Sequence, residues 1–319
     1  MSQSKRASSH LIRVLRDPIT LLAIALFIIF TALYTDKFLS PVSISSILRM
    51  FAIVSLLAIG PTFVVLMGSL DMTYVGIWML GGILVWLLFP YLGMPTIFTY
   101  IIFGAIIGLL NGVLFAKGKI PSFLITLAML AILGYMTTAA SGGMPKSVPE
   151  YSFLRVKIAS YIPSTFLLAL PVIAAALYVF YFTKVGTYLS AIGSNEEGAG
   201  LAGINVTKYK ILAFVISGLI TGAGSMIIFV DLGCQSPISI DFSRDVVGAL
   251  VAIVMGGTPL VGGVGGPHRT LLGALAYVLI YHGLIMSGLD PFTLRLAIGV
   301  TLLAAVIVAS KGLKGVIIA

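Results

Sequence analysis

Long apolar segments separated by short polar ones make up most of the chain. They approach the ~20 mostly apolar residues that a helix needs to cross a bilayer, and they lack the alternation typical of membrane β-strands. A short gap at 68–73 is either a loop or a break inside the membrane. The pattern predicts ten transmembrane helices, at 19–35, 47–67, 74–90, 95–116, 121–141, 161–183, 209–231, 245–262, 270–287 and 292–310.

Composition supports this interpretation. Hydrophobic residues make up 59% of the chain and charged residues 9%, whereas soluble domains have about 25% charged residues to cover their surfaces. The basic start of the chain precedes an apolar run without a convincing cleavage site, so we expect an uncleaved first helix. The prediction is an all-α polytopic membrane protein, with an N-terminal segment at 1–18, one transmembrane domain at 19–310 and a tail at 311–319.

The distribution of positive charge predicts the orientation. Ten helices place both termini on one side, and Lys and Arg concentrate in cytoplasmic loops. The net charge of +9 is spread over loops, which favours this explanation over nucleic-acid binding. The termini and the loop at about 184–208 are therefore predicted to be cytoplasmic. Their side holds twelve basic residues: Lys5, Arg6, Arg13, Arg16, Lys117, Lys119, Lys184, Lys208, Lys210, Arg269, Lys311 and Lys314.

The same loop contains the polar stretch AIGSNEEGAGLAG at 191–203. Ser194 and Glu197 have the spacing of a capping box, and negative charge at Glu196 and Glu197 suits the first turn of a helix. Gly203 is placed to end that helix. We therefore expect a short cytoplasmic helix with small side chains such as Ala199, which serves either as an ordinary loop helix or as a docking surface.

Glycines recur at intervals of four residues within two predicted helices. Gly104, Gly108 and Gly112 share one helix, and Gly218 and Gly222 share another. Glycine at this spacing lets helix backbones approach closely in a membrane. We favour packing within one subunit over a dimer interface.

Four polar residues are candidates for a helix break or a translocation path: Asp71, Thr73, Asn111 and Thr126. An acid near a membrane span is costly and is a functional candidate, although Asp71 is more simply explained as fixing a break through backbone N–H groups. Asn111 is expected to form a hydrogen bond to a neighbouring helix rather than to a solute. A stand-alone secondary transporter or channel is the alternative function, with Asp71 as its single candidate for ion coupling.

Enzymatic chemistry has little support in the sequence. Three histidines and Cys234 are scattered and form no metal-binding pattern. The Gly-rich stretch at 262–266 lacks the Lys and hydroxyl of a phosphate-binding loop. We therefore expect no cofactor and no catalytic residue.

Four segments in order resemble the permease subunits of ribose-type ABC importers, the sugar branch of a family that also holds branched-chain amino-acid permeases. The resemblance covers about 45–308. The segments are AIGPTFVVLMGSLDMTYVG at 58–76, IIGLLNGVLFAKGKIPSFLITLAML at 106–130, AIGSNEEGAGLAGI at 191–204 and GALVAIVMGGTPLVGGVGG at 248–266.

The resemblance implies a type II importer-like bundle of ten helices in the bacterial inner membrane, paired with a second permease subunit as a homodimer or heterodimer. It implies an ATP-binding partner and a substrate-binding protein, with a small neutral solute such as a monosaccharide as the cargo. In such permeases the short cytoplasmic helix docks into the ATP-binding subunit. The resemblance therefore assigns coupling to this stretch of the chain: Ser194, Asn195, Glu196, Glu197, Ala199 and Gly203.

Overall fold

The computed structural model describes residues 35–154, 157–158, 161–237 and 247–290, together with a few isolated positions. The predicted first and last helices, the N-terminal segment and the tail lie outside these ranges. The prediction that both termini are cytoplasmic therefore stays a prediction.

Within the described residues, seven helices are long and apolar enough to cross a membrane. They match seven of the predicted spans, with ends that differ by up to six residues. The spans are α4 (Pro41–Leu66), α5 (Thr73–Leu92), the 3-10 turn η1 (Met94–Phe98) continued by α6 (Thr99–Ala116), α7 (Ser122–Ser141), α8 (Ser164–Phe182), α11 (Val206–Leu232) and α13 (Pro267–Met286).

The predicted span at 245–262 is wrong at its C-terminal end. Helix α12 (Gly248–Met255) stops seven residues earlier, because Gly257 adopts a left-handed backbone with φ of 80°. Pro259 follows, and it lacks the N–H that a continuing helix requires. The eight described residues of α12 are too few to cross a bilayer at 1.5 Å per residue.

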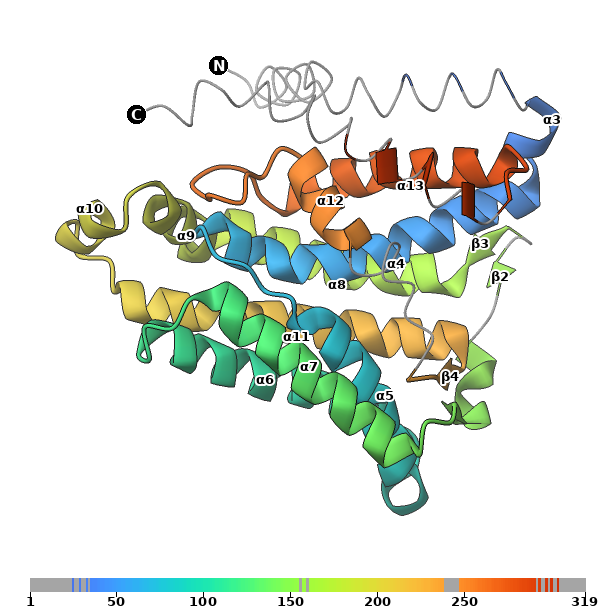
Figure 1. Ribbon diagram of the computed structural model, residues 1–319, viewed down its shortest axis with the longest axis horizontal. Helices are drawn as coiled ribbons and strands as arrows, with labels where there is room; N and C mark the ends of the chain where they lie inside the picture. The colour runs from blue at the N-terminus through green and yellow to red at the C-terminus, as the bar shows by residue number, and fades with distance from the viewer. Residues whose placement is uncertain are drawn as a thin grey trace.

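Shorter elements gather at the two ends of the bundle (Figure 1). The left-hand end in that view carries α9 (Lys184–Ser194) and α10 (Glu196–Leu201). At the opposite end β1 pairs antiparallel with β4, and β2 with β3. The remaining elements are α3 (Thr35–Phe38), β1 (Lys146–Ser147), η2 (Pro149–Leu154), β2 (Lys157–Ile158), β3 (Ile162–Pro163) and β4 (Cys234–Gln235).

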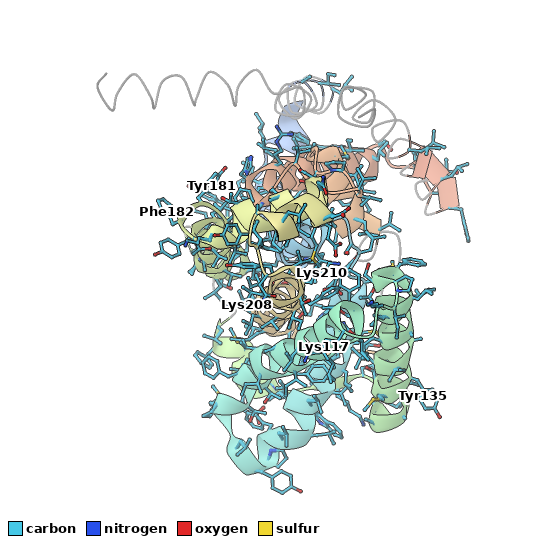
Figure 2. All side chains as sticks on the ribbon, turned by 90° about the vertical axis from the view of Figure 1, so that its left-hand side faces the viewer. Lys117, Tyr135, Tyr181, Phe182, Lys208 and Lys210 are labelled. Carbon is cyan, nitrogen blue, oxygen red and sulfur yellow. The ribbon has the colours of Figure 1, made fainter. Side chains whose placement is uncertain are left out.

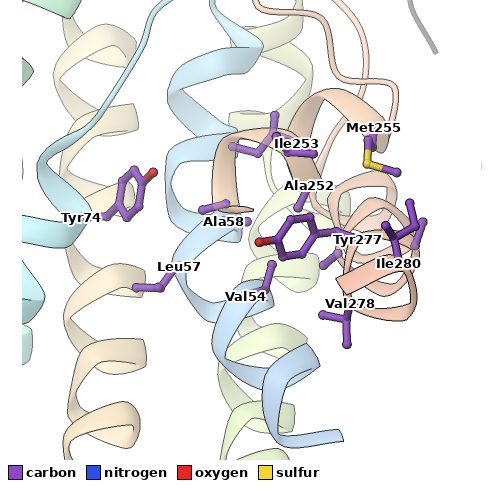
Figure 3. Close-up of a cluster of buried hydrophobic side chains, with 14 of the residues drawn as sticks. Val54, Leu57, Ala58, Tyr74, Ala252, Ile253, Met255, Tyr277, Val278 and Ile280 are labelled. Carbon is purple, nitrogen blue, oxygen red and sulfur yellow. The ribbon is translucent and has the colours of Figure 1, made fainter. Parts of the chain in front are cut away.

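Helix α11 is central to the packing. It contacts α4, α5, α6 and α8, and its contact with α6 is the most extensive. A large buried cluster joins α4, α5, α12 and α13, where Tyr277 lies near Val54 and Ala58 (Figure 3). The polar residues described below are therefore held between helices with closely packed apolar faces.

The predicted glycine residues of α6 and α11 face one another inside one subunit. A Cβ built on Gly104 would lie 2.1 Å from the carbonyl oxygen of Gly218, and one on Gly218 would lie 2.0 Å from that of Gly104. Gly108 and Gly222 approach backbone carbonyl oxygens equally closely, with Cβ distances of 2.2 and 2.4 Å. Any larger side chain on this contact would push the two helices apart.

We expect Gly104→Ala to lower the free energy of unfolding by ~1–3 kcal/mol, the usual cost of overpacking. Thermal unfolding of the detergent-solubilised protein measures the change. Gly134→Ala is the matched control, because a Cβ on Gly134 in α7 would meet nothing within 4 Å; its Tm should equal or slightly exceed that of the wild type. Equal Tm values for both variants would contradict the glycine contact.

Candidate functional site

Helix α10 lies between α9 and α11 and begins at a different cap from the one predicted. The side chain of Asn195 accepts a hydrogen bond from the N–H of Gly198 at 2.9 Å. The predicted capping box on Ser194 is wrong, because Ser194 is the last residue of α9 and its hydroxyl donates to the carbonyl of Ser190 at 2.9 Å. The extended backbone that a cap requires occurs one residue later, at Asn195.

The end of α10 is fixed by backbone hydrogen bonds around Gly203. Gly203 has φ of 85°, its N–H donates to the carbonyl of Gly200 at 3.0 Å, and the N–H of Ile204 donates to that of Ala199 at 3.1 Å. These two bonds form a Schellman motif, which needs a left-handed residue where the glycine lies. Ala199 is buried against Leu189 and its neighbours, so this face of the short helix is anchored.

The two glutamates of α10 have different surroundings. Glu196 forms an ion pair with Lys210 of α11, with 2.6 Å between Nζ and Oε1. Glu197 is exposed, and in the described part of the chain its carboxylate makes no ion pair with a basic side chain. Glu196 therefore ties α10 to the bundle, while Glu197 presents a free negative charge at the tip of this end.

Helix α9 was not predicted from the sequence, although its pattern indicates it. Val185, Leu189 and Ile192 recur at helical spacing and pack into the core. The helix has eleven residues, too few to cross a bilayer. Its role in the fold is to connect the apolar bundle to α10.

The end of α9 meets two segments that are remote in the sequence. A Cβ on Gly193 would lie 2.1 Å from the carbonyl oxygen of Leu66, the last residue of α4. The same carbonyl accepts a hydrogen bond from the N–H of Gly263 at 2.9 Å, and Gly263 in turn lies against Ser194. Backbones of the α9 end, the α4 end and the 262–263 turn are therefore in direct contact.

An irregular, non-helical connection separates α4 from α5. Gly68 has φ of 74°, which ends α4 as a left-handed residue does, and α5 begins at Thr73. Figure 1 shows this connection passing from the α9 end of the molecule back into the bundle before α5 begins. Asp71 lies in the connection and is only 2% exposed.

Hydrogen bonds surround the Asp71 carboxylate. Oδ1 accepts from both the backbone N–H of Thr73, at 2.9 Å, and its hydroxyl. Oδ2 accepts from the hydroxyl of Ser217 in α11 at 2.7 Å, and the amide of Asn111 in α6 donates to the Thr73 hydroxyl at 3.2 Å. Each carboxylate oxygen is thereby satisfied, as a buried acid requires.

Helix α7 completes the network through the residue before Asp71. The hydroxyl of Thr126 donates to the carbonyl of Leu70 at 3.3 Å, and that of Ser122 accepts from the N–H of Leu70 at 3.1 Å. The four predicted polar candidates thus converge on one break from three helices and the connection itself. Ser217 and Ser122 were missed, because a lone serine in or beside an apolar span gives no signal of its partner.

This arrangement holds a broken helix in place. Among the described residues, no group of three or more His, Cys, Asp or Glu side chains could hold a metal ion. The Asp71 network is closed to solvent. Its donors and acceptors bind one another, except that the side-chain oxygen of Asn111 is buried with no hydrogen-bond partner among the described residues. Its contacts are those of a structural connection between the helices.

Comparisons with known proteins place the chain among transport permeases. Residues 43–310 match the profile of the family described as branched-chain amino acid transport system / permease component. The chain is 27% identical to the ribose import permease protein of Escherichia coli, over 92% of this chain and 93% of that protein. It is 29% identical to the Bacillus subtilis ribose import permease protein, over 97% of each. Identity to the fructose import permease protein of Rhizobium meliloti is 28%, over 91% and 83%.

Proposed function

Because the chain belongs to the family of branched-chain amino acid transport system permease components, we propose that it is the permease subunit of an ATP-driven, binding-protein-dependent importer of a monosaccharide or related compound. The observation that supports this proposal most strongly is the similarity of the chain, along nearly its whole length, to ribose and fructose import permeases. It is a transport subunit rather than an enzyme, and a multi-pass protein of the bacterial inner membrane.

The proposed docking surface for the ATP-binding subunit is α10. The helix projects from one end of the bundle (Figure 1), and its cap and Schellman motif fix it at both ends. Glu197 and Gly200 are exposed, while Ala199 anchors the opposite face. A rigid helix that exposes a free carboxylate at Glu197 and an apolar side chain at Leu201, which is 86% exposed, is suited to enter a groove on a partner.

The contact at Gly193 supports a route from this helix into the bundle. Movement of α10 would displace the end of α9, and α9 touches the carbonyl of Leu66 without an intervening side chain. Two residues later Gly68 begins the connection that carries Asp71. We propose that closure of the ATP-binding partners reaches the broken helix by this route.

We expect Gly193→Ala to uncouple ATP hydrolysis from sugar uptake. Its Cβ would clash with the Leu66 carbonyl, so α9 must shift away from α4 while α10 keeps its own caps. We expect the ATP-binding partner to be retained and the sugar imported per ATP hydrolysed to fall severalfold. Reconstituted vesicles measure this ratio, with Gly134→Ala as the control. An unchanged ratio in Gly193→Ala would contradict the route.

The opposite end of the molecule is the proposed surface for the binding protein. The β1–β4 pair lies there (Figure 1), and Lys146 of β1 lies over the Trp86 ring at 4.4 Å. Nearby, Asp231 of α11 joins α4 and α8 by pairing with Arg49 at 2.5 Å and accepting from Thr165. Exposed apolar residues on α6, α7 and α8 are suited to lipid and to a second permease subunit.

Uptake by proteoliposomes tests the function. The permease would be reconstituted with its ATP-binding subunit and binding protein, and import of labelled ribose, xylose and fructose would be followed. We expect import of a monosaccharide that requires all three proteins and ATP. Import by the permease alone, driven by a proton or sodium gradient, would instead establish a stand-alone secondary transporter.

A further inference from the structure

A groove of about 450 Å³ lies beside α10 and is separate from the Asp71 network. It is formed where α6 ends and α11 begins, together with the connection that leads from α6 to α7. Its apolar lining includes Phe115, Ile120 and Val206, and its charged lining is Lys119, Lys210 and Glu196.

The groove has an excess positive charge. Glu196 is neutralised by Lys210 at 2.6 Å, and the Lys210 ammonium also lies 5.0 Å from the centre of the Phe115 ring. Lys119 is exposed and, in the described part of the chain, its ammonium makes no ion pair with an acidic side chain. Figure 2, which views this end directly, shows Lys117 and Lys208 there with Lys210. An anion in the groove would be attracted chiefly by Lys119, with Lys117 and Lys208 adding positive charge at the same end.

The backbone at Lys119 is unusual. Its φ of 54° is the one positive value among the described non-glycine residues. A left-handed conformation costs a residue with a Cβ roughly 1–2 kcal/mol, which glycine or asparagine largely avoids. The chain thus holds a lysine, at some cost in stability, where its side chain lines the groove.

The groove also adjoins apolar surface. Leu110 and Leu114 of α6, and Phe123 and Leu127 of α7, are between 42 and 47% exposed and flank the connection that forms the groove. Helices α6 and α11 are long and apolar enough to cross a membrane, so we expect their ends to lie near its surface. Helix α10 projects beyond these ends (Figure 1). A ligand with both a negative headgroup and acyl chains matches these two surfaces together.

We propose that this groove binds the headgroup of an anionic phospholipid, with Lys119 contacting its phosphate and the acyl chains lying along α6 and α7. Basic pockets between transmembrane helices are suited to such headgroups. An acidic protein segment would satisfy the lysines but would leave the adjoining apolar surface unmatched. The inference requires only that the chain spans the membrane, so it does not depend on the identity of the transported solute.

Native mass spectrometry of the purified permease, without any partner, tests the proposal. Phosphatidylglycerol and phosphatidylcholine with the same acyl chains would be titrated separately. We expect preferential binding of phosphatidylglycerol, reduced about fivefold in Lys119→Asn, which is the effect expected of removing one lysine near an anionic surface. Asparagine tolerates the left-handed backbone, so this variant should fold. Lys184→Asn removes an exposed lysine outside the groove and should bind as the wild type does.

Equal binding of the two lipids by the wild type, or unchanged binding by Lys119→Asn, would overturn the proposal. Displacement of phosphatidylglycerol by equimolar glycerol phosphate, which has no acyl chains, would assign the groove to a soluble phosphate compound instead. Normal lipid binding by Lys119→Asn combined with weaker retention of the ATP-binding subunit would assign the groove to protein docking. Because the lipid titration omits that subunit and the sugar, its failure would leave the importer function unaffected.

Discussion

Glu197→Lys is expected to lower ATP-driven sugar uptake at least about tenfold while the bundle stays folded. Glu197 is exposed on α10, so a lysine there disturbs little within the chain, apart from a few tenths of a kcal/mol at the first turn of the helix. At the proposed interface it would reverse a charge, and like charges brought together cost several kcal/mol. The loss of uptake should therefore appear without a matching change in Tm.

The measurement is retention of the ATP-binding subunit during purification, together with uptake. Glu150→Lys makes the same charge change on an exposed residue of η2, at the end opposite α10, and should retain the partner. Glu197→Gln keeps the size without the charge and should lie between the wild type and the lysine variant. Normal uptake by Glu197→Lys would remove the coupling role from this residue.

Asp71→Ala is expected to cause the largest loss of stability. It removes the acceptor of three hydrogen bonds, from the Thr73 N–H, the Thr73 hydroxyl and the Ser217 hydroxyl. A buried donor left without a partner costs about 1–3 kcal/mol, so the summed effect reaches several kcal/mol and the yield of folded protein should fall sharply. Thermal unfolding and size-exclusion chromatography in detergent measure it.

Two milder variants make the Asp71 prediction sharper. Ser217→Ala removes one donor and leaves the carboxylate its two bonds to Thr73, so its Tm should fall least. Asp71→Asn keeps the shape with one acceptor oxygen and should be intermediate. Wild-type stability in Asp71→Asn with complete loss of uptake would contradict the helix-break interpretation and would place Asp71 in the translocation path.

The apolar pattern predicts helices well where the bilayer sets their length. Spans such as α6 and α7 were located within a few residues, because each must bury about 20 apolar residues in lipid. The pattern fails where apolar residues continue beyond the end of a helix. Leu260 and Val261 extended the predicted span beyond α12, although the left-handed backbone at Gly257 had already ended the helix. Hydrophobicity alone does not register the backbone conformation of a glycine.

The sequence alone does not show which remote segments contact one another. The glycine spacing on α6 and α11 indicated close approach, but only the structure pairs Gly104 with Gly218. Likewise, Asp71 was recognised as costly, while its partner Ser217 lies 146 residues further along the chain. The cap of α10 moved by one residue to Asn195, because α9 occupies the residues that a free loop would have left available.

The most direct measurement is co-expression of the tagged permease with the ATP-binding subunit of a ribose-type importer, followed by purification and an ATPase assay. We predict that a stoichiometric partner copurifies and hydrolyses ATP, and that Glu197→Lys releases it. The assignment of this chain to an ATP-driven importer would be contradicted by a well-folded permease that retains no such partner and that transports sugar by itself, driven by an ion gradient.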